Sequence, residues 1–243
     1  MADALRDAEA VLRDEQAPLG LDALDETALH PILARGLEQA GWGVHREALY
    51  PSDHESADSA RDRCDLVLTD DPDAVLLDPV HADRRVRAGE GTLFADLATQ
   101  MESAASAGAA NPADAAWVEV KAVAQHAYRD GVPGPNRAYA TEMVNGPAAD
   151  VCKLVGDARI ERAAACLVLF TEDESVARHD IQRVAHRLLD DGLPIGIPEI
   201  ASVPIADRAG NARVTVAVFP IRGLGLFQEA DDAADATGDD PAS

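Results

Sequence analysis

Three side chains on two short apolar segments could together carry out a metal-assisted hydrolysis. Glu119 and Lys121 belong to residues 117–121, where apolar residues recur at every second position, a pattern that predicts a strand. Residues two apart on a strand point to the same face, so these two side chains should be neighbours. Asp65 lies near the start of a second strand-like run, residues 63–69. One Asp, one Glu and one Lys on two core strands are typical of a divalent-metal hydrolysis site.

Mg²⁺ or Mn²⁺ would suit this set of side chains. Mg²⁺ takes oxygen ligands at about 2.0–2.1 Å and is usually held by one or two carboxylates together with substrate phosphate oxygens. A bound cation polarises the phosphoryl group and lowers the pKa of a coordinated water, while a nearby ammonium can position that water. We therefore expect Asp65 and Glu119 to be ligands and Lys121 to assist the attack.

The scarcity of lysine makes Lys121 informative. The chain has two lysines, Lys121 and Lys153, against 19 arginines among 243 residues. A Glu-x-Lys pair on a strand is common by chance and most often belongs to a solvated face. The order of the motif residues, their strand context and the rarity of lysine together favour function. For Lys153, a surface position on an amphipathic helix and a role beside the site are equally good interpretations.

This order of residues resembles the PD-(D/E)XK nuclease superfamily, whose signature is a strand-borne Asp followed by Glu-x-Lys on the next strand. The resemblance covers about residues 26–171. It implies a restriction-endonuclease-like fold, an α/β domain with a mixed central β-sheet flanked by helices. Many members carry a Glu on the first helix, where this chain offers Glu26 and His30 as further metal ligands. Members also often place a basic or polar residue where Lys153 lies, facing the site.

The elements expected from periodicity follow the order that the resemblance implies. A helix, three strands, a helix and a strand are predicted at residues 27–40, 42–50, 64–69, 116–121, 151–164 and 166–171. Helices are also expected at 2–16 and 176–189, and strands that extend the sheet at 195–203 and 213–220. Two departures from the family are Cys64, where proline usually precedes the Asp, and a long insertion, residues 70–115, with its own helix near 93–103.

Composition predicts one domain over residues 1–228 and an acidic disordered tail over 229–243, which carries no base and no large apolar residue. No apolar run reaches the length of a membrane span and the N-terminus lacks a signal-peptide pattern, so a cytoplasmic protein without a membrane partner is expected. Three widely spaced cysteines, in apolar segments, should be reduced core residues; they are Cys64, Cys152 and Cys166.

A nucleic-acid partner, expected to be DNA, requires a local basic patch, because the formal net charge is −23. The candidate phosphate contacts are Arg84, Arg85, Arg87, Arg129, Arg137 and Lys153. Arg84, Arg85 and Arg87 cluster inside the insertion, which would then fold over the site as a clamp. If it does not, a partner protein or a homodimer contact is the expected use of the insertion.

Two other classes of function remain open from the residues. A nuclease-like fold could serve as a catalytically inactive module that binds nucleic acid or protein, in keeping with the acidic surface. Residues 65–70 also look like the phospho-acceptor strand of a response-regulator receiver, with Asp70 as the acceptor. That interpretation needs a lysine after a later strand ending in Thr or Ser, and none follows residues 167–171. It therefore ranks last.

Overall fold

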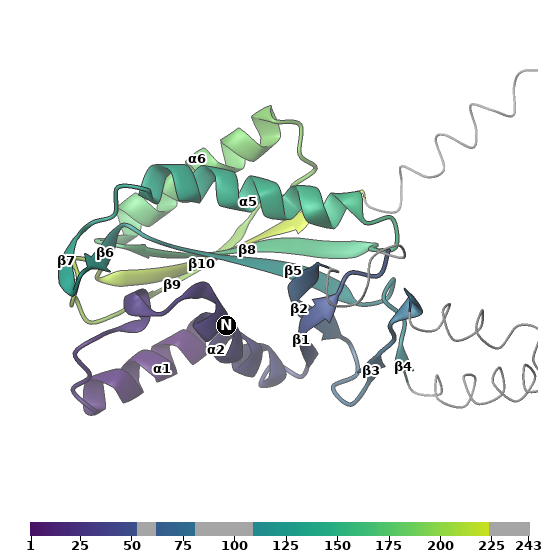
Figure 1. Cartoon of the computed structure of the whole chain (residues 1–243), viewed down its shortest axis with the longest axis horizontal. Coiled ribbons are helices and arrows are strands. Elements are labelled where there is room, and N and C mark those ends of the chain that lie inside the picture. The colour runs from purple at the N-terminus through teal and green to yellow at the C-terminus, as the bar shows by residue number, and fades with distance from the viewer. Residues whose placement is uncertain (53–61, 81–108, 224–243) are drawn as a thin grey trace, which may run out of the picture.

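A computed structural model describes residues 1–52, 62–80 and 109–223. Its centre is a six-stranded sheet with the strand order β1-β2-β5-β8-β10-β9 (Figure 1). The strands are β1 (Gly43–Leu49), β2 (Arg63–Thr69), β5 (Ala116–Ala124), β8 (Arg162–Thr171), β9 (Glu199–Pro204) and β10 (Arg213–Ile221). β5 and β8 run parallel, while all other neighbouring strands of this sheet run antiparallel. The predicted α/β class with a mixed sheet is confirmed.

Helices cover both faces of the sheet. α1 (Ala2–Asp14) and α2 (Glu26–Glu38) lie on one face, and α5 (Tyr139–Gly156) and α6 (Glu174–Asp190) on the other (Figure 1). Each face therefore has its own apolar core, one built with Leu29 and Leu33 of α2 and the other with Val151 and Leu154 of α5. No helix in the described part of the chain is long and apolar enough to cross a bilayer.

The sequence of β5 explains how one strand serves both cores. Val118 and Val120 pack on the α1–α2 side, whereas Trp117 and Val123 pack on the α5–α6 side. This is the period-two alternation of a strand with a helix layer on each face. Because β5 and β8 are parallel, the chain needs a crossover to return to the same end of the sheet, and α5 provides it.

Several predicted elements change their bounds. The helix expected at 151–164 is wrong, since α5 begins at Tyr139 and ends at Gly156, and residues 162–164 already belong to β8. The alanines at 163–165 suit either structure, and pairing with both β5 and β10 decides for a strand. Similarly, β9 begins only at Glu199, while Ile195 makes an isolated bridge with Ile221.

Other segments were not anticipated or lie outside the described residues. A hairpin of β6 (His126–Arg129) and β7 (Val132–Pro135) turns at Asp130-Gly131, both with positive φ, as in the favoured two-residue hairpin turn. The insertion contributes the short parallel strands β3 (Val75–Leu76) and β4 (Ala109–Ala110). The predicted helix near 93–103 and the tail 229–243 are outside the described ranges.

All three cysteines are free, but they are not all core residues. Cys64 and Cys166 are buried, as expected, and burial raises the pKa of the Cys166 thiol to about 12. Cys152 is exposed, because it lies on the side of α5 that turns away from the sheet. Its prediction as a core residue is therefore wrong.

Candidate active site

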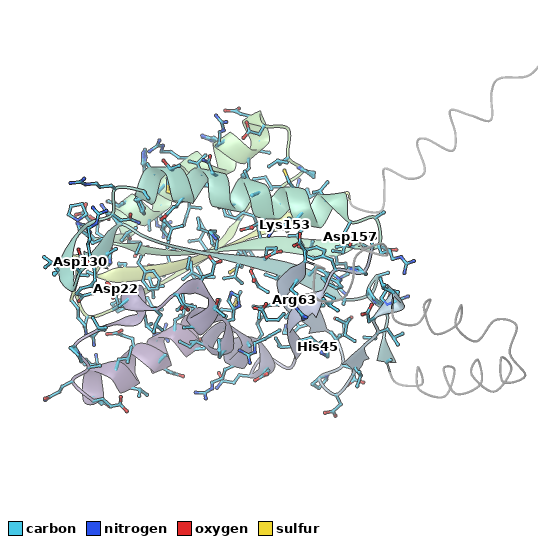
Figure 2. The ribbon with its side chains drawn as sticks, in the orientation of Figure 1. Asp22, His45, Arg63, Asp130, Lys153 and Asp157 are labelled. Carbon is cyan, nitrogen blue, oxygen red and sulfur yellow. The ribbon has the colours of Figure 1, made fainter. Side chains whose placement is uncertain are left out.

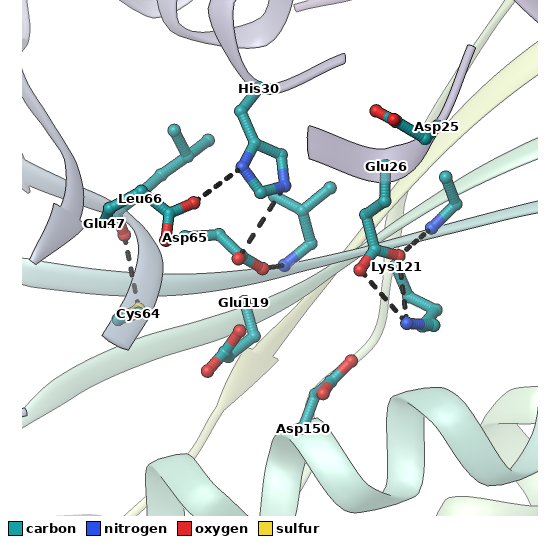
Figure 3. Close-up of polar contacts among 12 residues, drawn as sticks. Asp25, Glu26, His30, Glu47, Cys64, Asp65, Leu66, Glu119, Lys121 and Asp150 are labelled. Atoms are coloured by element: carbon teal, nitrogen blue, oxygen red, sulfur yellow. Dashed lines mark hydrogen bonds and ion pairs between the residues drawn. The ribbon is translucent and has the colours of Figure 1, made fainter. Parts of the chain in front are cut away.

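The site forms where β2 and β5 stop pairing. β2 pairs with β5 only through Leu66–Leu68 opposite Ala116–Val118, and β5 then continues to Ala124 without a paired strand on this side. Buried backbone N–H groups require partners. Two carboxylates replace the missing strand: the Val120 N–H donates to Oδ2 of Asp65 at 2.7 Å, and the Ala122 N–H donates to Oε2 of Glu26 at 2.8 Å (Figure 3). The divergence of the strands thus fixes two acids in one gap.

Glu119 and Lys121 both point from β5 toward α5. Glu119 is 3% exposed, and its Oε1 accepts a hydrogen bond of 2.6 Å from the Tyr50 hydroxyl. Lys121 places its ammonium 2.9 Å from Oε2 and 3.1 Å from Oε1 of Glu26. Lys121 of β5 is therefore held by Glu26 in the first turn of α2. The Asp25 side chain caps this helix by accepting a hydrogen bond from the Ala28 N–H.

The stem of Lys121 runs across Gly146 of α5. A Cβ atom at Gly146 would lie 2.6 Å from Cδ and 2.9 Å from Cε of Lys121. Glycine inside a helix usually weakens it by about 0.5–1 kcal/mol relative to alanine. A reason for glycine here is the space that it leaves for the lysine.

We expect Gly146→Ala to lower the rate of any reaction that uses Lys121 without destabilising the fold. The new methyl group meets a flexible side chain, so Lys121 should move and the helix should stay in place. A misplacement on the order of 1 Å can cost roughly 100-fold in rate. Cleavage kinetics and urea unfolding should be compared with Asn145→Ala, an exposed neighbour on α5. Equal activity of both variants with wild type would contradict the positioning of Lys121 by Gly146.

The second lysine of the chain reaches the same site. Lys153 on α5 lies 3.9 Å from Oε1 of Glu119 and 3.9 Å from Oδ1 of Asp150. Asp150 and Lys153 are three residues apart, which puts them on one face of the helix. Of the two interpretations of Lys153, the structure favours the position beside the site, although its side chain is half-exposed. Both lysines of this lysine-poor chain therefore lie beside acids of the site, Lys121 next to Glu26 and Lys153 next to Glu119 and Asp150.

His30 approaches the cluster from α2, one turn after Glu26. It is 3% exposed, with Nε2 at 3.7 Å from Oδ1 of Asp65 and Nδ1 at 3.4 Å from Oε1 of Glu47 (Figure 3). Among the His, Cys, Asp and Glu side chains of the described ranges, one group of three could hold a metal ion, because its possible ligand atoms lie within 4.8 Å of one another. The group consists of His30, Glu47 and Asp65. Glu47 was not anticipated from the sequence, because nothing distinguishes it from other polar residues of its strand.

Burial among like charges shifts the acids toward their protonated forms. Desolvation, followed by a hydrogen bond with Asp65, raises the pKa of Glu119 to about 8, against a smaller opposing effect of Tyr50. Burial raises the pKa of Asp150 to about 6, although Lys121 and Lys153 lower it. Burial also opposes the charge of Lys121, but Glu26, Asp150 and Asp65 outweigh it and raise the pKa of that ammonium. The site has an excess of negative charge that a cation would relieve.

Of the arginines predicted to contact phosphates, Arg129 and Arg137 are described, and they are not part of this cluster. Arg129 and Arg137 line a hollow of about 500 Å³ on the β6–β7 hairpin. Figure 2 labels the neighbouring Asp130 at the opposite end of the molecule from Asp157, with Lys153 between them. The residues Arg84, Arg85 and Arg87 lie outside the described ranges, so the clamp stays a prediction.

The receiver interpretation is wrong. Receivers are built on a parallel, doubly wound sheet. β2, which would carry the phospho-acceptor, is antiparallel to both of its neighbours. Asp70 itself lies 3.4 Å from the Arg162 guanidinium on β8.

Comparison of the chain with known protein families, with curated proteins and with solved structures finds no match. The assignment of a function therefore depends on the geometry of the site.

Proposed function

We propose that this chain is a metal-dependent nuclease that hydrolyses phosphodiester bonds in DNA with Mg²⁺ or Mn²⁺. The observation that carries the proposal is that Glu119 and Lys121 both interact with Asp65 where β2 and β5 diverge. A surface Glu-x-Lys pair would not be expected to have its glutamate almost fully buried beside another strand's aspartate. The Lys153 ammonium at 3.9 Å from Glu119 adds to this argument.

The topology is consistent with a restriction-endonuclease-like fold. The chain order α2-β1-β2-β5-α5-β8 is the helix, three strands, helix and strand that the resemblance implies. Within it, β1, β2 and β5 are successive antiparallel neighbours and β8 joins in parallel. β9 and β10 then extend the sheet on the far side of β8.

The side chains around Asp65 fit a divalent cation: His30, Glu47 and Asp65 bring possible ligand atoms within 4.8 Å of one another, and Glu119 lies beside Asp65. Asp65 and Glu119 offer carboxylate oxygens, and His30 offers a buried ring nitrogen for which the described residues supply no hydrogen bond. Carboxylates suit Mg²⁺ and Mn²⁺, and imidazole is the commonest metal ligand among side chains. When bound, the cation would polarise the phosphoryl group and lower the pKa of a coordinated water. Protonated Glu119 must release its proton to become a ligand.

Lys121 and Glu26 supply the remaining chemistry. The Lys121 ammonium stays charged in its acidic surroundings, so it can orient an attacking water and stabilise the negative charge that develops on the phosphoryl oxygens. Glu26 holds that ammonium through both of its oxygens while also accepting from the Ala122 N–H. We therefore assign Glu26 to positioning Lys121, in place of the metal-ligand role considered from the sequence.

Substrate would approach beside Glu119. A hollow of about 280 Å³ is lined by Tyr50, Ser52, Asp62, Lys153, Gly156 and Asp157. Tyr50 and Lys153 each contact Glu119, so this hollow adjoins the carboxylates. A phosphate next to the scissile bond would find the half-exposed Lys153 ammonium here.

We expect Lys153→Ala to weaken DNA binding and to flatten its salt dependence. Each phosphate contact on duplex DNA contributes about 0.9 to the slope of log affinity against log salt. Fluorescence anisotropy at several salt concentrations, in Ca²⁺ to prevent cleavage, would measure this slope. The exposed Arg183→Ala on α6 is a matched control. An unchanged slope for Lys153→Ala would exclude a phosphate contact at this position.

The function itself is tested by incubating purified protein with single-stranded, double-stranded and branched DNA in Mg²⁺, Mn²⁺ or chelator. Cleavage is expected only with the cations, and it should disappear in Asp65→Asn prepared in the same way, which excludes a contaminating nuclease. If no substrate is cleaved but DNA is bound, the catalytically inactive binding module replaces the nuclease as the assignment.

A further inference from the structure

The orientation of His30 raises a question that the three motif residues do not answer. Its ring is buried between two carboxylates, with Nδ1 toward Glu47 and Nε2 toward Asp65. Neither nitrogen has a hydrogen-bond partner among the described residues. A neutral imidazole carries its proton on one nitrogen and a lone pair on the other. Which carboxylate receives the proton therefore decides which nitrogen can bind a cation.

Glu47 reaches His30 through an unusual backbone conformation. Its φ is 54°, in the left-handed region, which a non-glycine residue seldom adopts. The β1–β2 ladder is interrupted at the same place: Arg46 pairs with Leu66 and Ala48 with Cys64, while the register passes over Glu47 and Asp65.

The unusual backbone conformation of β1 at Glu47 lies next to an irregularity of β2 around Asp65. Cys64 and Val67 both pack in the α5–α6 core, whereas Leu66 packs in the α1–α2 core, so the alternation of β2 is broken around Asp65. Outliers of this kind persist where surrounding structure enforces them, and they cluster at functional sites. Here the two irregularities turn Glu47 and Asp65 toward the two nitrogens of one ring.

We propose that Glu47 is a positioning residue, which accepts the Nδ1–H of His30 and so leaves the Nε2 lone pair directed at Asp65 to bind the divalent cation. Metal-binding histidines usually donate their other ring N–H to a carboxylate or carbonyl, which fixes the tautomer and the ring orientation. Glu47 suits this role better than that of a ligand, because its side chain is 49% exposed and it faces the nitrogen farther from Asp65. That a cation binds here depends on the proposed function, whereas the tautomer of His30 does not.

The tautomer can be read directly in the metal-free protein. Long-range ¹H–¹⁵N spectra of ¹⁵N-histidine-labelled protein distinguish a protonated from an unprotonated ring nitrogen, and His30→Gln assigns the signal. We expect the ring proton on Nδ1, and loss of that preference in Glu47→Ala. A wild-type ring protonated on Nε2, or the same tautomer in both proteins, would overturn the proposal.

Metal affinity separates a positioning residue from a ligand. Loss of an outer partner of a ligating histidine typically costs 10–100-fold in affinity. We expect about this loss of Mn²⁺ affinity for Glu47→Ala, measured by electron paramagnetic resonance. Glu47→Gln should stay within a few-fold of wild type, because its amide oxygen still accepts from Nδ1–H. If Glu47→Gln loses as much affinity as Glu47→Ala, Glu47 is a direct ligand and the proposal is wrong. The exposed Glu38→Ala on α2 should match wild type.

Glu47→Gly excludes a purely structural explanation. Glycine adopts positive φ without steric cost. This variant should therefore unfold at the same or a higher temperature than wild type while binding Mn²⁺ 10–100-fold more weakly. A lower unfolding temperature with unchanged affinity would assign Glu47 to the fold and overturn the proposal. If the protein binds Mn²⁺ as expected but cleaves no DNA, the nuclease assignment is wrong and the role proposed for Glu47 still holds.

Discussion

Lys121→Ala is expected to reduce cleavage by roughly 100- to 1,000-fold while leaving divalent-cation binding at or above the wild-type level. Loss of one charge-stabilising group in an active site typically has an effect of about this size. The ammonium is paired with Glu26 and lies among the charges of Asp150 and Asp65, so its removal makes the cluster more negative and does not remove a ligand. Single-turnover cleavage and Mn²⁺ titration should be measured on the same preparation.

Asp65→Asn supplies the contrast. It removes the carboxylate that faces Nε2 of His30 and accepts from the Val120 N–H, so both cleavage and cation binding should be lost. Asparagine can still accept from that N–H, and the fold should survive. If Lys121→Ala and Asp65→Asn lose cation affinity to the same extent, Lys121 supports the structure of the site and does not have the catalytic role proposed for it.

Glu119→Gln is expected to be more stable than wild type at pH 8–9 and to lose this advantage near pH 5, when both are measured without divalent cations. The pKa of Glu119 rises from 4.5 to about 8 on folding. Between these values the folded protein binds more protons than the unfolded chain, so its stability falls as pH rises. Each unit of pKa difference corresponds to about 1.4 kcal/mol, and the change across this range should be a few kcal/mol.

Urea unfolding at several pH values would measure this difference. The amide introduced by Glu119→Gln retains an oxygen that can accept from Tyr50, so the substitution mainly removes the titration. Asp150, whose pKa is also raised, is present in both proteins, and the exposed Glu161→Gln controls for loss of one negative charge. If the free energies of unfolding of wild type and Glu119→Gln change in parallel with pH, Glu119 does not titrate as inferred. Added Mn²⁺ should stabilise wild type most at high pH, where Glu119 is ionised.

Parts of the fold follow from local patterns. The strand-like runs around Asp65 and Glu119 are strands, and the helix before them carries Glu26 and His30 one turn apart. These features are predictable because the two-residue period of a strand and the 3.6-residue period of a helix fix which side chains share a face. The prediction of a helix over 151–164 was wrong at its C-terminal end. The apolar residues there are compatible with helix and with strand, and only their sheet partners decide between the two.

That Glu119 and Lys121 share one face of a strand could be predicted from the residues alone, since the backbone sets this relation within three residues. The rarity of lysine likewise singled out Lys121 and Lys153 before any fold was known. The contacts of Lys153 with Glu119, of Glu26 with Lys121 and of Glu47 with His30 became visible only in the folded chain. These contacts depend on how α2 and α5 pack on opposite faces of the sheet and on where β2 leaves β5. Such distances between elements are set by packing of the whole core, and no local period encodes them.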